Sequence, residues 1–211
     1  MKKGFFATEF AAVLLFFVLP PLFAPSVPQG QTMHFSWMTF ALAALALMLW
    51  MQTRELSEHT RVESAGFLVC QAQCLMTFGA LMASAGIFEA VARLALRAES
   101  VRFLPPRTLI GWLNIMLGIP CAAFYEEVLY RAYLPAAIRR VFPPAPPFAG
   151  EAFAVLVFAL AHRTSGWLSV AHAAIAGALL RWCFCKTARL WTNVAAHTAY
   201  NAIMTALTFV L

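Results

Sequence analysis

Residues 109–140 read LIGWLNIMLGIPCAAFYEEVLYRAYLPAAIRR, an apolar run with three charged residues, Glu126, Glu127 and Arg131, well inside it. The run is compatible with one helix from about residue 108 to residue 140. At 1.5 Å per residue such a helix is about 48 Å long, whereas the hydrocarbon core of a bilayer is about 30 Å thick. We therefore expect the helix either to protrude from a membrane or to bend at Pro120.

The composition of the whole chain also indicates a membrane protein. Of its 211 residues, 62% are hydrophobic and 11% are charged, and the mean hydropathy is +0.75. Soluble domains contain about 25% charged residues, and a chain of this size has no interior large enough to hide so much apolar surface. The predicted fold class is all-α: a polytopic transmembrane helical bundle in the lipid bilayer, forming one integral membrane domain.

About seven apolar stretches approach the roughly 20 residues that a spanning helix needs. The first stretch could also be a signal peptide, because Lys2 and Lys3 precede it. It is long for that role and Glu9 interrupts it, so we expect a retained span. Arginines recur through residues 93–107, which predicts a segment lying along the membrane surface. The seven expected helices cover residues 5–23, 33–51, 65–90, 108–140, 148–162, 167–185 and 190–211.

The basic residues stand singly or in pairs between the apolar stretches. Despite the formal net charge of +6, this pattern indicates membrane loops and no nucleic acid partner, because phosphate binding needs a contiguous basic face. The Lys and Arg bias favours a cytoplasmic N-terminus, although the loop around residues 93–107 opposes it. The five cysteines have no disulfide or structural zinc spacing and are interpreted as packing residues.

Ionisable side chains inside a span are costly and mark candidate sites. Glu127 and Arg131 are four residues apart, so they share a helix face and can pair. Glu126 points about 140° away from Arg131 and has no local partner. This spacing predicts that Glu127 and Arg131 support the helix while Glu126 remains free for chemistry, as a general base or acid. The alternative is a purely structural ion pair with a spare carboxyl.

Two further motifs carry polar groups in apolar helices. His162 follows Phe158 by four residues, and His197 precedes Asn201 by four residues on one helix face. The second pair suits oxyanion stabilisation, metal binding or an interhelical hydrogen bond. His172 and Asn114 are interpreted as packing residues. Taken together, the motifs supply base, acid and oxyanion groups for water attack on a carbonyl, and no serine or cysteine has a base nearby in sequence.

The order E-E-x-x-x-R, F-x-x-x-H and H-x-x-x-N resembles the CPBP family of CAAX proteases and bacteriocin-processing enzymes, also called the Abi or type II CAAX endopeptidase family. The resemblance begins at about Leu109 and covers roughly the last half of the chain. It departs from the common pattern at Ala132, where glycine is frequent, and at Tyr130, where phenylalanine is frequent. The resemblance divides the chain into N-terminal helices with the interfacial segment (residues 1–107) and a catalytic helical core on the last four helices (residues 108–211).

The resemblance implies an intramembrane endopeptidase that cuts a membrane-associated or lipidated peptide or protein. Glu126 would activate water with help from His162, while His197 and Asn201 would form the oxyanion site and Glu127 with Arg131 would support it. No cofactor is required by this mechanism. The family has also been regarded as metalloproteases, and zinc would then be held by Glu126, His162 and His197. We expect an integral protein of a bacterial inner (plasma) membrane.

Two other functions fit the same residues. The chain could be a non-catalytic immunity or scaffold protein of the same fold, with structural polar groups. It could also be a small proton-coupled transporter that uses the buried Glu and His as a relay, although no inverted repeat is present. The expected depths of His162 and His197 pose a problem for catalysis, because a simple crossing of residues 148–162 places the two rings near opposite membrane faces.

Overall fold

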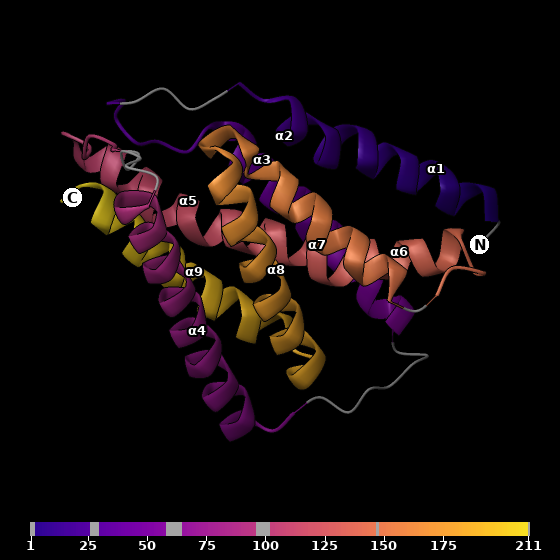
Figure 1. The fold of residues 1–211 in the computed structure, drawn as a ribbon. Helices are drawn as coiled ribbons and strands as arrows, with labels where there is room; N and C mark the ends of the chain where they lie inside the picture. Colours follow the sequence, from indigo (N-terminus) through magenta and orange to yellow (C-terminus); the bar gives the residue numbers. More distant parts are fainter. Residues whose placement is uncertain (1–2, 26–29, 58–64, 96–101, 147, 211) are drawn as a thin grey trace.

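A computed structural model describes residues 3–25, 30–57, 65–95, 102–146 and 148–210. These residues form an all-α bundle, shown in Figure 1, in which every one of the seven expected stretches is helical. The first is a continuous rod of three parts, and the fourth is likewise a continuous rod. The rods and helices are α1 (Lys3–Val13), η1 (Leu14–Val18) and α2 (Leu19–Phe23); α3 (Trp37–Ser57); α4 (Phe67–Leu94); α5 (Leu109–Glu127), η2 (Val128–Tyr133) and α6 (Leu134–Val141); α7 (Ala149–Ala161); α8 (Trp167–Thr187); and α9 (Leu190–Thr208).

Four of these stretches are long and apolar enough to cross a membrane: Phe6–Phe23, Phe67–Leu94, Leu109–Val141 and Trp167–Thr187. Trp37–Met51 and Ala149–Ala161 are apolar but shorter. With 13 residues, α7 is about 20 Å long and falls short of the bilayer core. Large apolar side chains are exposed along the outer helix faces, for example Leu15, Leu68 and Ile110. Such a surface suits lipid rather than water, so the chain is an integral membrane bundle.

The long rod of α5, η2 and α6 forms the middle of the bundle. It packs against α3, α7 and α9, while α8 packs against α4 and α7, and α9 also packs against α4. In Figure 1, α1 runs along one edge with its N-terminus beside α6. Val128, Leu129 and Leu134 of the rod are completely buried, so the segment that follows the two glutamates lies in the core.

The rod departs from α geometry after the glutamates rather than at Pro120. Pro120 lies inside the continuous α5, whereas Val128–Tyr133 forms a π-helix. Arg181 of α8 donates a hydrogen bond of 2.9 Å to the main-chain carbonyl of Arg131 within this π-helix. Arg181 is itself paired with Glu151 of α7, so α7 and α8 together hold the irregular turn. π-Turns inside α-helices occur frequently at functional sites.

The predicted interfacial segment, residues 93–107, lies partly outside the described residues, which exclude 96–101. Residues 58–64, which follow α3 and include Glu58, Arg61 and Glu63, are likewise not described.

Candidate active site

The two adjacent glutamates end α5 and differ sharply in environment. The Glu127 side chain is completely buried, whereas that of Glu126 is 24% exposed. Arg131, one turn later on η2, is also buried, and its Nε lies 3.3 Å from Oε2 of Glu127. The pairing expected from the four-residue spacing is therefore present, and Glu126 is the carboxyl group that remains accessible.

Glu127 is surrounded by donors. Asn193 of α9 donates from Nδ2 to Oε2 of Glu127 at 2.9 Å, and Nδ1 of His197 lies 2.8 Å from Oε1. The positively charged guanidinium of Arg131 lies beside the same carboxyl group. A buried carboxylate is tolerated when its oxygens are hydrogen-bonded and its charge is paired. All three neighbours favour the ionised form of Glu127.

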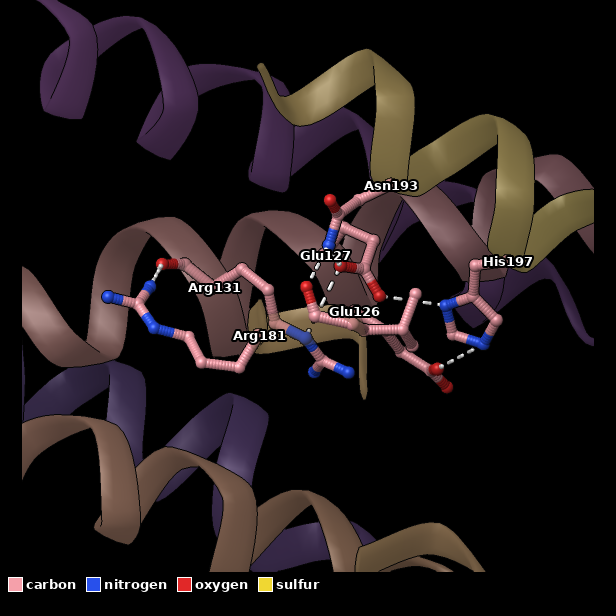
Figure 2. Close-up of polar contacts among 7 residues, drawn as sticks. Glu126, Glu127, Arg131, Arg181, Asn193 and His197 are labelled. Atoms are coloured by element: carbon pink, nitrogen blue, oxygen red, sulfur yellow. Dashed lines mark hydrogen bonds and ion pairs between the residues drawn. The ribbon is translucent and has the colours of Figure 1, made fainter. Parts of the chain in front are cut away.

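His197 lies between the two glutamates, as Figure 2 shows. Because an ionised Glu127 only accepts hydrogen bonds, Nδ1 of His197 carries a proton. The opposite nitrogen, Nε2, faces Oε2 of Glu126 at 3.6 Å. Glu126 was expected to lack a local partner, and its neighbour instead comes from α9. His197 thus connects the exposed carboxyl group to the buried one.

Asn193 is a site residue that the sequence reasoning missed. It is fully buried, and its Nδ2 donates both to Glu127 and, at 2.6 Å, to the main-chain carbonyl of Leu180 in α8. It precedes His197 by four residues, so Asn193, His197 and Asn201 form one N-x-x-x-H-x-x-x-N line on α9. That periodicity was the available signal.

Phe158 joins the second motif to the rest of the site. Its buried ring lies 4.3 Å below Cζ of Arg131, a cation–π contact. The same ring is 4.7 Å from the ring of His162 and 6.3 Å from that of His197, between centroids. The two histidines therefore border one phenylalanine, and the expected placement near opposite faces was wrong.

His162 ends α7 with a defined ring orientation. Its Nδ1 lies 2.8 Å from the main-chain carbonyl of Phe158. A carbonyl can only accept, so Nδ1 donates, and in the neutral ring Nε2 keeps its lone pair. In this form, Nε2 of His162 can accept a proton or a hydrogen bond from water. In the described part of the chain, no hydrogen bond or ion pair joins His162 to Glu126 or to His197.

Asn201 is half-buried one helical turn beyond His197. Within the described ranges it makes no hydrogen bond to the other candidate residues, so its membership of the site rests on the shared face of α9.

The two residues that were interpreted as packing residues, His172 and Asn114, make specific hydrogen bonds in the structure. His172 lies with Nε2 3.2 Å from Oγ of Ser84, and Asn114 exchanges hydrogen bonds of 2.7 and 2.9 Å with the main chain of Phe35.

The alternative zinc set of Glu126, His162 and His197 does not fit this arrangement. Among the described residues, no group of three or more His, Cys, Asp or Glu side chains is placed to hold a metal ion. Nδ1 of His197 faces Glu127 and Nε2 faces Glu126, but no contact in the described part of the chain brings His162 to the same point. We therefore derive no catalytic step through a metal.

The comparisons with known proteins address the part of the chain that carries these residues. No match was found among curated proteins or among solved structures. Glu126, His162, His197 and Asn201 all lie within the segment that matches a family. Residues 108–203 match the type II CAAX prenyl endopeptidase Rce1-like family, which confirms the resemblance predicted from the three motifs.

Proposed function

We propose that this chain is an intramembrane endopeptidase that hydrolyses a peptide bond of a membrane-associated or lipidated peptide or protein, with Glu126 as the catalytic acid and base. One observation carries the proposal: His197 bridges a partly exposed carboxyl group, Glu126, and a buried, fully paired one, Glu127. Neighbouring titratable groups in contrasting environments are a recurrent arrangement for acid–base catalysis. The family match supports the same reaction class.

In the proposed reaction, Glu126 takes a proton from a water molecule as the water oxygen bonds to the scissile carbonyl carbon. The carbonyl oxygen becomes an oxyanion. When this intermediate collapses, the carbon–nitrogen bond breaks and Glu126 returns its proton to the leaving amine. The products are a free carboxyl group and a free amine, so atoms and charge balance without a cofactor.

The other residues have supporting roles in this mechanism. Glu127 fixes Nδ1 of His197 as a donor, which aims Nε2 at the position of Glu126 and of the reacting groups. A protonated Nε2 and the amide of Asn201 are the proposed donors to the oxyanion. His162, with its lone pair on Nε2, is the proposed second partner of the water. Arg131 maintains the charge of Glu127.

The burial pattern argues against the proton-relay alternative. A proton relay needs solvent access at both ends. Of the three connected groups Glu126, His197 and Glu127, only Glu126 is partly exposed to solvent. Glu127 is completely buried and ends against the buried Arg131. The scaffold alternative remains as an outcome of the test below, because its polar groups would be purely structural. We propose a bacterial inner membrane with a cytoplasmic N-terminus as the setting.

The test uses purified, detergent-solubilised protein and a pool of lipidated and unlipidated membrane peptides, with cleavage followed by mass spectrometry. The wild type is compared with Glu126→Gln, and with Glu89→Gln as a matched control on α4, where the carboxyl group is partly exposed beside Arg93. We expect cleavage by the wild type and the control, and a loss of about 10²–10⁴-fold for Glu126→Gln. A strong chelator is added in a parallel arm, where activity should persist. A folded Glu126→Gln protein with full activity would overturn the assignment, and a wild type that cuts nothing would support the scaffold alternative.

A further inference from the structure

The first helical rod, outside the family-matched residues 108–203, contacts the residue that immediately precedes Glu126. The hydroxyl of Tyr125 donates a hydrogen bond of 3.1 Å to the main-chain carbonyl of Phe17. The two rings also pack at 6.2 Å between centroids. Tyr125 is buried, so the bond is shielded from competing donors. Phe17 belongs to the π-helix η1, which places an irregular turn of the first rod against the end of α5.

A second contact involves the residue that immediately follows His162. Nε of Arg163 donates to the main-chain carbonyl of Leu22, and Nη2 donates to that of Ala24 at 3.0 Å. These carbonyls lie at the end of α2, where the last helical carbonyls lack partners within the helix. A guanidinium also complements the negative end of the helix dipole. Arg163 therefore attaches the end of the first rod to the end of α7.

Further contacts keep the first rod aligned along the bundle. Phe10 packs edge-to-face on Phe142 at 6.3 Å, and Val13 and Val18 are buried in the same apolar cluster as Tyr125. The remaining face of the rod exposes Leu15, Phe16 and Phe23. The rod's hydrogen bonds to the sequence neighbours of Glu126 and His162 are those with Tyr125 and Arg163. Glu9 of the same rod also bonds to Tyr133.

We propose that Tyr125 and Arg163 are positioning residues, through which the first rod fixes the separation of Glu126 on α5 from His162 on α7. This inference rests on the proposed function. Glu126 and His162 come from different helices and share no hydrogen bond in the described residues. Besides the packing of Phe158 on Arg131, the first rod connects the two helices, because its carbonyls at Phe17, Leu22 and Ala24 accept bonds from Tyr125 and Arg163. A displacement of about 1 Å in a catalytic group can lower the rate about 10²-fold.

The test compares Tyr125→Phe and Arg163→Gln with Arg189→Gln as a matched control. Arg189 also donates from Nε to a main-chain carbonyl, that of Ala65, at 2.9 Å, but it contacts a different joint of the bundle. We expect kcat to fall at least tenfold for the first two variants with KM unchanged, and both constants to stay near wild type for the control. The double variant Tyr125→Phe/Arg163→Gln should lose less than the product of the two single losses, because both bonds act through one rod.

A second measurement does not depend on activity. Diethylpyrocarbonate modification of His162, quantified by mass spectrometry, should be faster in Arg163→Gln than in wild type and unchanged in Arg189→Gln. An active wild type with unaffected variants would overturn this inference while leaving the proposed function intact. An inactive wild type would overturn the proposed function, and the modification rate would still decide the geometry: an unchanged rate in Arg163→Gln would show that the rod does not position His162.

Discussion

Exchanging either adjacent glutamate for glutamine should inactivate the protein, but only the second exchange should destabilise it. Glu127→Gln removes the charge that faces the buried Arg131 guanidinium at 3.3 Å. Breaking a buried ion pair from one side costs about 3–5 kcal/mol, because the remaining charge is left uncompensated. For a chain of this size, each kcal/mol lost from the free energy of unfolding lowers the melting temperature by about 2–4 °C. The melting temperature of Glu127→Gln should therefore fall by roughly 6–20 °C.

Glu126→Gln should behave differently. Its carboxyl group is partly exposed and lies 3.6 Å from His197, beyond hydrogen-bond distance. Because this contact is longer than a hydrogen bond and Glu126 is the more exposed carboxyl group, the melting temperature should fall less than for Glu127→Gln. Cleavage should nevertheless be lost, since the side chain can no longer accept a proton.

The assay is thermal unfolding of both variants in the same detergent, followed by tryptophan fluorescence, with Glu151→Gln as control. Glu151 pairs with Arg181 and Arg139 at a site that is 32% exposed, so its loss should be smaller than that of Glu127. Equal melting temperatures for Glu126→Gln and Glu127→Gln would refute the division of roles between the two carboxyl groups.

Three other substitutions test the surroundings of the site. Asn193→Ala removes a donor to the buried Glu127, and we expect a stability loss of about 1.5–3 kcal/mol together with reduced cleavage; an unchanged melting temperature would show that the bond contributes nothing. Phe158→Leu keeps an apolar side chain but loses the ring beneath the guanidinium, worth about 2 kcal/mol when desolvated. Cleavage should slow by more than the loss of folded protein explains. A variant that cuts more slowly but unfolds at the wild-type temperature would contradict a cation–π contribution to stability. Gly118→Ala would drive a methyl group into the ring of Phe35, with an expected loss of about 1–3 kcal/mol in thermal unfolding. Wild-type stability in that variant would mean that Phe35 moves without cost.

The parts of the site that the sequence predicted are those that depend on one helix. The spacing of Glu127 and Arg131 fixes a shared face, and the structure pairs them. The helical stretches could likewise be read from apolar runs, because a bilayer sets their length and polarity. The π-helix was not predicted. Its position depends on Arg181, which reaches the Arg131 carbonyl from another helix.

Contacts between helices were not predictable in the same way. His197 was expected at an oxyanion site with Asn201, and the structure places it between the carboxyl groups of two residues of α5. Asn193 was overlooked although it continues the four-residue spacing of His197 and Asn201, because its acceptors lie on other helices. The depth problem does not arise in the structure, because the rings of His162 and His197 both lie beside the ring of Phe158.

The two carboxyl groups of the site differ in how their charge is balanced. Glu127 and Arg131 neutralise each other in a region without solvent exposure. Glu126 and His197 form the second pair, and an ionised Glu126 is neutralised only when His197 carries protons on both nitrogens. In the proposed mechanism, Glu126 takes its proton from water as negative charge moves to the oxyanion. The buried pair of Glu127 and Arg131 therefore keeps its charges unchanged, and the reacting proton stays at the more exposed carboxyl group.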